Sequence, residues 1–251
     1  MGRPFERLSK VDQTRLLLDI LEHSKHRGGK AARPVVVFDL DGTLLDNRTR
    51  TRAILHEFAA STRETHAAFA STLETLVEEH IHYGIAPTLE RMGIVDAPYI
   101  ERATAFWKDR FFHDPHLHHD VPLKGAVAYA RACYERGAIV AYVTGRDLPY
   151  MSLGTFKSLR DHGFPIGISG TELVLKPNPE IPDETFKRDV APELRRIGDV
   201  IAAFDNEPGN CNLFLEEYPE SFSVLLDTQH APNPPGLLPK VHVIEDFETI
   251  A

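Results

Sequence analysis

Apolar residues follow a helical spacing near the start of the chain and then gather in short uninterrupted runs. Over residues 9–25 they recur every three or four positions, and two glycines follow at 28 and 29, which predicts a helix that ends at the glycine pair. After Pro34 the run VVVF at 35–38 is wholly apolar and rich in β-branched residues. Such a run is typical of a strand buried on both faces of a parallel sheet.

Beyond Pro122 helical and strand-like patterns alternate to the end of the chain. Strands that alternate with helices predict a three-layer, Rossmann-like α/β fold, whose parallel strands are joined by right-handed crossovers. The proline-rich segment 227–240 is expected to be a loop. Helices are expected at 126–136, 148–162, 183–196 and 208–218, and strands at 138–143, 173–175, 200–204, 222–226 and 241–244.

Residues 47–120 interrupt this alternation with a long stretch that is helical in character. The stretch is rich in Ala, Glu, Thr and Leu and shows no strand-like alternation, so we expect an all-helical cap domain inserted into the core. The chain then divides into an N-terminal helical segment at 1–33 that packs on the core, an α/β core formed by 34–46 and 121–251, and the insert at 47–120.

The chain is acidic, with 28 Lys and Arg against 37 Asp and Glu and a formal net charge of −9 over 251 residues. Nucleic acids and anionic membranes are bound by basic surfaces, so neither is an expected partner. No apolar run reaches the roughly 20 residues of a membrane span, and the first ten residues lack the apolar core of a signal peptide. We therefore expect a cytoplasmic protein.

Acidic and hydroxyl side chains follow three of the predicted strands. Asp39 and Asp41 come directly after the first strand, two positions apart, and Thr144 and Asp205 follow two later strands. Ligands of open α/β sheets bind outside the carboxyl ends of the strands, so we expect these side chains to converge. Carboxylates at one edge repel one another unless a cation compensates them, and an all-oxygen set of ligands suits Mg²⁺. The pattern indicates metal-assisted phosphoryl transfer.

The string FDLDGT at 38–43, with the later threonine, lysine and aspartate, resembles the four motifs of the haloacid dehalogenase superfamily, and specifically of its phosphatase branch. The resemblance covers about residues 34–244, and the helical insert occupies the position of the family's small cap domain, between the first and second motifs. An aspartate two positions after the nucleophile favours phosphate esters over halides, because a departing halide needs no proton.

The resemblance implies a role for each matching residue. It implies that Asp39 is the nucleophile, which forms an aspartyl-phosphate, and that Asp41 is the general acid and base. It also implies that the Thr144 hydroxyl donates to a phosphoryl oxygen and that Gly145 supplies an adjacent backbone amide.

The remaining matches concern the phosphate and the metal. Gly42 and Thr43 match the turn whose backbone N–H groups approach the phosphate. Asp205 matches the ligand that would hold Mg²⁺ together with the nucleophile's carboxylate and the main-chain carbonyl of Asp41. Arg146, next to the second motif, is a candidate for binding an anionic group of the substrate.

Two parts of the resemblance leave alternatives open. The third-motif lysine is either Lys187, which leaves room for a helix, a turn and a strand before the fourth motif, or Lys176, which precedes a proline. We favour Lys187. Because the fourth motif reads Asp-Asn rather than Asp-Asp, one of Asn206, Glu207 and Asn210 is left to assist the metal.

Four histidines, His113, His116, His118 and His119, lie within seven residues near the end of the insert. Four imidazoles can chelate zinc or nickel, but the context FFHDPHLHHD is typical of a linker between the insert and the core, and we interpret the cluster as such. The aromatic residues at 106, 107, 111 and 112 are expected to pack the insert, and the alternative is that they form an aromatic wall over the substrate.

The sequence therefore predicts a Mg²⁺-dependent phosphatase that hydrolyses a small phosphorylated metabolite through an aspartyl-phosphate on Asp39. The helical insert would close over the site, exclude water and select the leaving group. Two alternatives stay open: a phosphotransferase or mutase of the same superfamily, and a catalytically silent binding module that keeps the fold.

Overall fold

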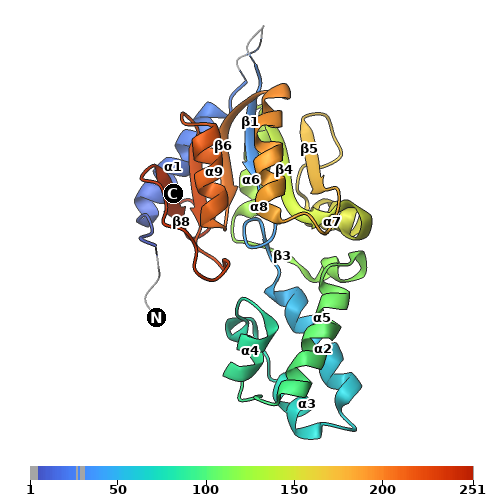
Figure 1. Ribbon diagram of the computed structural model, residues 1–251. Coiled ribbons are helices and arrows are strands. Elements are labelled where there is room, and N and C mark those ends of the chain that lie inside the picture. The colour runs from blue at the N-terminus through green and yellow to red at the C-terminus, as the bar shows by residue number, and fades with distance from the viewer. Residues whose placement is uncertain (1–4, 27, 29–31, 251) are drawn as a thin grey trace.

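The structure of the protein, a computed structural model, describes residues 5–26, 28 and 32–250. Its core is a parallel sheet of six strands in the order β5-β4-β1-β6-β7-β8 (Figure 1). With helices on both faces of this sheet, the predicted three-layer α/β fold is confirmed. The strands are β1 (Pro34–Phe38), β4 (Ile139–Asp147), β5 (Thr171–Lys176), β6 (Asp199–Asp205), β7 (Phe222–Leu226) and β8 (Val241–Ile244).

Side chains of the strands alternate between two apolar layers, one on each face of the sheet. Val36 and Phe38 of β1 belong to the layer formed with α1, α6 and α7. Val35 and Val37 belong to the layer formed with α8, η3 and α9, so β1 is buried along its whole length. The core helices are α1 (Lys10–His23), α6 (Ala126–Glu135), α7 (Leu148–His162), α8 (Asp183–Val190), the 3₁₀ helix η3 (Ala191–Arg196) and α9 (Pro208–Glu217).

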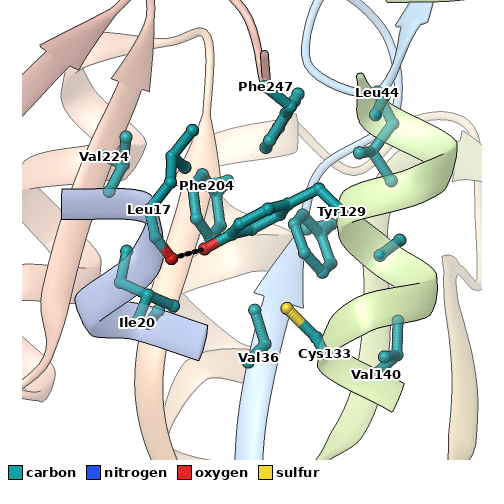
Figure 2. Packing of buried hydrophobic residues seen from close by; sticks show 14 of the residues in the cluster. Leu17, Ile20, Val36, Leu44, Tyr129, Cys133, Val140, Phe204, Val224 and Phe247 are labelled. Carbon is teal, nitrogen blue, oxygen red and sulfur yellow. Dashed lines mark hydrogen bonds between the residues drawn. The ribbon is translucent and has the colours of Figure 1, made fainter. Parts of the chain in front are cut away.

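Aromatic rings fill the layer beneath α1 and α6. The Tyr129 ring lies between α6 and the sheet, and its hydroxyl donates a hydrogen bond to the main-chain oxygen of Leu17 in α1 at 3.1 Å (Figure 2). Phe38 and Phe204 are paired across β1 and β6, and their buried rings stack with centroids 5.0 Å apart. Because these phenylalanines immediately precede the predicted nucleophile and metal ligand, their packing holds both aspartates at the same edge of the sheet.

Between β2 (Leu45–Asp46) and β3 (Val121–Pro122) the chain leaves the core and forms a helical insert at one end of the sheet (Figure 1). The two short strands pair antiparallel where the insert joins the core. The insert has an apolar core of its own, in which Leu55, Leu73 and Leu89 are fully buried. Its elements are α2 (Arg48–Thr62), α3 (Ala67–Leu73), the 3₁₀ helix η1 (Glu78–His80), α4 (Ile85–Arg91), α5 (Ala97–Phe111) and the 3₁₀ helix η2 (Asp114–His119).

The observed elements differ from the predicted ones in three places. The helix expected at 183–196 ends at Val190 and continues as η3, because Pro192 has no N–H to donate to the carbonyl four residues earlier. β4 runs on to Asp147 rather than ending at residue 143, so the second motif is part of the strand. β2 and β3 have two residues each, which is too short for periodicity to reveal.

The described part of the N-terminal segment forms α1. Ser9 caps this helix, since its hydroxyl accepts a hydrogen bond from the Asp12 N–H at 3.1 Å, and the helix ends at His23. Residues 1–4, 27, 29–31 and 251 lie outside the described residues, and with them one glycine of the pair predicted to end the helix. Among the described helices, none combines the length and the apolar character needed to span a membrane.

Candidate active site

Three adjacent strands bring the predicted site residues to the carboxyl edge of the sheet. Asp39 follows β1, Thr144 lies in β4 and Asp205 ends β6, and β1 is paired with both of the other strands. Lys187 reaches the same edge from α8. Asp39, Asp41, Thr144 and Lys187 border a cavity of about 440 Å³, and Asp205 contacts Lys187.

The Lys187 ammonium lies between two carboxylates. Its Nζ donates to Asp39 Oδ1 at 2.8 Å and to Asp205 Oδ2 at 2.6 Å, and all three side chains are buried. The other eligible lysine, Lys176, forms an ion pair with Asp183 at 2.7 Å. Of the two lysines that the sequence left open, Lys187 is therefore the one in contact with the predicted nucleophile.

Charge in this group is incompletely balanced, because one ammonium serves two carboxylates. Burial raises the pKa of Asp39, Lys187 lowers it, and Asp205 and Asp41 raise it; the net result is a pKa of about 7. Burial lowers the pKa of Lys187, but Asp205 and Asp39 outweigh this and hold it above its ordinary value, so the lysine stays protonated. The two carboxylates therefore leave one negative charge that a further cation can neutralise.

Asp41 takes part in a buried group of two arginines and two aspartates, which we call the arginine–aspartate cluster: Asp41, Arg50, Asp120 and Arg146. Arg146 binds both Asp41 carboxylate oxygens, at 2.7 and 2.8 Å, and Arg50 donates to Asp41 Oδ1 at 2.5 Å. Both arginines also bind Asp120, at 2.5 and 2.8 Å. Burial raises the pKa of Asp41, but Arg146 and Arg50 outweigh it and hold the pKa well below its usual range.

The cluster joins the insert to the core. Arg50 belongs to α2, and Asp120 immediately precedes β3, whereas Asp41 and Arg146 belong to the core. Arg50 is 0% exposed, donates to the main-chain oxygen of Phe111 at 2.7 Å and stacks over that residue's ring at 3.9 Å. Sequence reasoning missed Arg50 and Asp120, because Arg50 is one of three alternating arginines in the string RTRTR and nothing in the string marks the buried one.

The prediction that Arg146 binds a substrate anion is not supported by its position. Its guanidinium nitrogens donate to Asp41 and Asp120, and Nη1 also donates to the Thr155 hydroxyl at 3.3 Å. A guanidinium bound to two carboxylates, one of them fully buried, has little capacity left for a ligand. In this arrangement Arg146 orients Asp41.

We expect replacement of Asp120 by alanine to lower the free energy of unfolding by about 3 kcal/mol or more, because it leaves two buried guanidiniums short of a carboxylate. Urea denaturation followed by circular dichroism measures this change. Asp161→Ala, which removes a half-exposed aspartate paired with Arg160, is the matched control and should cost less than about 1 kcal/mol. Equal losses in the two variants would show that the cluster contributes nothing special to stability.

The turn after β1 uses the N–H groups of Gly42 and Thr43 in its own hydrogen bonds. The N–H of Gly42 donates to the Leu45 carbonyl at 2.8 Å and the N–H of Thr43 to the Leu40 carbonyl at 3.1 Å, so both are used within the turn rather than offered to a phosphate. Gly42 has a φ of +77°, and a Cβ there would lie 2.5 Å from the Asn206 side chain. Glycine at this position therefore permits both the turn and the close approach of the fourth motif.

The second motif stays close to the predicted site. Thr144 is buried at the cavity wall, and its hydroxyl oxygen accepts a hydrogen bond from the Arg146 N–H at 3.3 Å. A Cβ on Gly145 would collide with the Asp183 carboxylate, so glycine lets α8 pack close to the end of β4. Both residues border the cavity, as a phosphate-binding role requires.

The residues after Asp205 have distinct partners. The Asn210 amide donates to Asp205 Oδ1 at 3.1 Å, so Asn210 orients that carboxylate. The Asn206 amide donates to the main-chain oxygen of Gln229 at 2.5 Å, and Glu207 accepts from the Ala231 N–H at 2.9 Å. Of the three residues that the sequence left open, Asn210 is thus the one whose side chain contacts the predicted metal ligand.

The donor set suits a hard cation such as Mg²⁺. Among the described residues, none donates a hydrogen bond to Asp39 Oδ2 or to the main-chain oxygen of Asp41, so both oxygens are available. No three His, Cys, Asp or Glu side chains of the described residues form a metal-binding group. Two carboxylates and a carbonyl fit Mg²⁺, which keeps several of its waters and needs few protein ligands.

The histidine cluster lies apart from this site. The His118 and His119 rings approach to 3.9 Å between centroids, and His118 Nδ1 lies 2.7 Å from the Pro115 carbonyl. His116 Nε2 lies 3.3 Å from the Glu57 carboxylate. Within the described residues these contacts are local, and the four imidazoles do not form a chelating group.

The insert supplies the wall of the cavity that faces the aspartates. Of the aromatic residues expected to pack the insert, Phe106 and Trp107 do so, and Trp107 also borders the cavity. Phe111 and Phe112 border the cavity as well. The segment after η1 borders it as well, through Ile81 and the residues that follow, up to Ile85. The cavity is therefore built from both parts of the chain, with charged groups on the core side and mostly apolar groups on the insert side.

Known proteins share this architecture. A family model described as haloacid dehalogenase-like hydrolase matches residues 34–204. A solved structure from Clostridium difficile with a provisional phosphatase designation superposes with a TM-score of 0.56 at 13% identity, covering 87% of this chain and 96% of that one. A predicted phosphatase from Clostridium acetobutylicum gives a TM-score of 0.51 at 13% identity, covering 86% of this chain and 95% of that one. At such identities the two structures show the fold alone.

Family membership follows from the match in sequence. No curated protein matches the chain. The family model nevertheless spans more than half of it, from the start of β1 through the insert and β4 to Phe204 in β6. The protein therefore belongs to the haloacid dehalogenase-like hydrolases.

Proposed function

We propose that the protein is a Mg²⁺-dependent phosphatase that hydrolyses a phosphate monoester of a small molecule through an aspartyl-phosphate on Asp39. The observation that carries the proposal is that one oxygen of the Asp39 carboxylate is bound by Lys187 and the other has no donor among the described residues. Lys187 fixes Oδ1 at 2.8 Å, while Oδ2 has no donor among the described residues and borders the cavity. A carboxylate held in this way is oriented for attack on a phosphorus atom.

In the first half of the reaction, an Asp39 oxygen attacks the phosphorus and the bond from phosphorus to the leaving oxygen breaks. The leaving oxygen takes a proton from the Asp41 carboxyl group, and the phosphoryl group is now attached to Asp39. The Lys187 ammonium offsets negative charge on the phosphoryl oxygens, and the Thr144 hydroxyl is placed to donate a hydrogen bond to one of them.

In the second half, a water oxygen attacks the same phosphorus, the bond to Asp39 breaks and inorganic phosphate leaves. Asp41, which became a carboxylate when it protonated the leaving group, accepts a proton from this water. Its contacts with Arg146 and Arg50 hold the pKa of Asp41 well below its usual range, so both proton transfers require Asp41 to lose at least one guanidinium. Arg50 belongs to the insert, so movement of the insert relative to the core can provide this change.

The carboxylates of Asp39 and Asp205 and the main-chain oxygen of Asp41 are the groups that would hold Mg²⁺. When bound, the ion supplies positive charge against the phosphoryl oxygens. Asn210 keeps the Asp205 carboxylate oriented, and Lys187 keeps the two carboxylates from repelling each other when the ion is absent. The phosphotransferase and silent-module alternatives have no contact that favours them.

The helical insert, residues 47–120, serves in this proposal as the cap that covers the site. The cavity between insert and core, about 440 Å³, is the size of a small-molecule pocket. A polymeric substrate such as nucleic acid is disfavoured by the net charge of −9. The insert therefore selects the leaving group, while the core carries the chemistry.

Hydrolysis of p-nitrophenyl phosphate by the purified protein tests the proposal. We expect release of p-nitrophenol with Mg²⁺, a loss of about 100-fold or more with excess EDTA, and recovery when Mg²⁺ is added back. The Asp39→Asn variant, purified in parallel, reports any contaminating phosphatase. Hydrolysis that persists unchanged in EDTA would overturn the metal requirement, and equal rates in the wild type and the variant would overturn the hydrolase proposal itself.

A further inference from the structure

Three aromatic rings form a continuous surface on the insert side of the cavity. The Trp107 ring lies 4.4 Å from that of Phe111 and 5.7 Å from that of Phe112, and the two phenylalanine rings are 5.0 Å apart. The Trp107 Nε1–H donates to the Thr51 hydroxyl at 3.2 Å, which fixes the plane of the indole. We call these three residues the aromatic wall.

The aromatic wall is only partly covered by protein. Phe112 is 45% exposed, and Trp107 and Phe111 are half-buried. Trp107 packs with one part against the core of the insert, whose own members are buried almost completely. Rings that serve packing alone are normally buried, and exposed clusters of large apolar groups mark binding sites. Their exposed faces border the cavity that also holds Asp39.

The part of the cavity formed by the insert carries no Asp, Glu, Lys or Arg among the described residues. Its titratable members are His82 and Tyr83. Burial lowers the pKa of His82, and Arg91 lowers it further, so His82 is neutral. The buried Arg50 guanidinium belongs to the arginine–aspartate cluster. A second phosphate, a carboxylate or an ammonium on the leaving group would therefore find no opposite charge on the insert.

The volume of the cavity is large enough for an aromatic ring together with a phosphoryl group. Cavities of about 150 Å³ accept benzene in other proteins, and the space of about 440 Å³ here has to hold a phosphoryl group as well. A leaving group of one or two fused rings fits these limits. A flat ring also gains from stacking on the wall, by more than its buried area alone provides.

We propose that the aromatic wall selects phosphate monoesters whose leaving group is an uncharged aromatic ring. This inference rests on the phosphatase function proposed above and adds the substrate class. The leaving group lies against Trp107, Phe111 and Phe112 with its phosphoryl group at Asp39. Polyhydroxylated esters and esters with a second charge are disfavoured, because the wall offers them neither hydrogen bonds nor opposite charge.

Two esters with leaving alcohols of similar reactivity separate recognition from chemistry. Release of inorganic phosphate from 2-phenylethyl phosphate and from glycerol 1-phosphate is measured with Mg²⁺ present. We expect kcat/KM to be about 10- to 100-fold higher for the phenylethyl ester. Equal values, or a preference for glycerol 1-phosphate, would overturn the inference while leaving the phosphatase proposal intact.

Substitutions in the aromatic wall test whether its rings cause the preference for the phenylethyl ester. Phe112→Ala is the first choice, because its side chain is 45% exposed and its removal opens no buried cavity. We expect it to reduce the ratio of the two kcat/KM values by about three- to tenfold, because kcat/KM falls more for the phenylethyl ester than for glycerol 1-phosphate. Phe156→Ala, which removes a similarly exposed phenylalanine on α7 outside the cavity, is the matched control and should change neither substrate.

Trp107 is the single tryptophan of the chain, so its fluorescence reports binding without turnover. Titration with 2-phenylethylphosphonate, which cannot be hydrolysed, should change the emission to saturation, whereas 3,4-dihydroxybutylphosphonate should not at the same concentrations. If neither ester is hydrolysed but the phenylethylphosphonate still changes the emission, the phosphatase proposal fails and the ring site stands. If both phosphonates change the emission alike, or neither does, the ring site is overturned.

Discussion

Asp39→Asn is expected to reduce phosphate monoester hydrolysis by about 10³-fold or more, mostly in kcat. The amide keeps the size of the side chain, and its oxygen can still accept a hydrogen bond from Lys187. It carries no negative charge, however, and an amide oxygen is a poor nucleophile toward phosphorus. Initial rates with p-nitrophenyl phosphate and Mg²⁺, measured beside the wild type, give the ratio.

The fold of this variant should survive, which makes the loss of activity interpretable. In the wild type two carboxylates share one buried ammonium, and neutralising one of them removes repulsion between Asp39 and Asp205. We therefore expect an unfolding midpoint in metal-free buffer at least equal to that of the wild type. Asp161→Asn makes the same chemical change at a half-exposed position and should keep full activity. Activity above about 1% in Asp39→Asn would falsify the covalent mechanism.

The convergence of the site residues could be predicted because it depends on topology. Asp39, Thr144 and Asp205 each follow an apolar run, and the carboxyl ends of parallel strands meet at one edge whatever the details of packing. The strand-helix alternation gave the layers of the core for the same reason. The choice of Lys187 over Lys176 also rested on spacing, and the structure brings Lys187 to Asp39.

Contacts that depend on how the insert meets the core could not be predicted. Arg50 and Asp120 become partners of Asp41 and Arg146 only once α2 and β3 are placed against the sheet, and nothing local distinguishes Arg50 from Arg48 or Arg52. The contact of Arg146 with a substrate anion stays a prediction, and the two aspartates that bind its guanidinium lie far away in the chain. Long-range ion pairs leave no periodic signal.

The turn after β1 and the aromatic wall show two further limits. The motif implied that Gly42 and Thr43 belong to a turn whose backbone N–H groups approach the phosphate. The N–H groups of these two residues are used within the turn, and a pattern of residue types does not specify such hydrogen-bond partners. Phe111 and Phe112 have the composition of a packing cluster, and only the position of α5 above the sheet edge shows that they border the cavity. Composition can identify apolar residues, but their exposure is a property of the fold.

Lys187→Met is expected to lower kcat by about 10³-fold, whereas Lys176→Met should lower it less than about threefold. Methionine keeps the length of the lysine stem and removes its charge. Without the ammonium, Asp39 and Asp205 lose the cation that both of them bind, at 2.8 and 2.6 Å, and the phosphoryl oxygens lose a charge-assisted partner. Lys176 makes its ion pair with Asp183, whose side chain is 62% exposed. The two substitutions are chemically identical, so the ratio of their kcat values reports the effect of the lysine's position alone.

Folding must be controlled in this comparison, because Lys187→Met leaves two buried carboxylates without their ammonium. Their mutual repulsion destabilises the charged form, so part of any loss could reflect unfolding rather than catalysis. Urea denaturation with and without Mg²⁺ separates the two effects. If the variant is folded in Mg²⁺ and still inactive, the loss of activity is due to the missing ammonium of Lys187 and not to unfolding. The opposite order, with Lys176→Met the more damaging substitution, would move the third-motif role to Lys176. That result would also require α8 to sit differently against the sheet, because the Lys176 ammonium is bound to Asp183 and has no contact with Asp39 in the described residues.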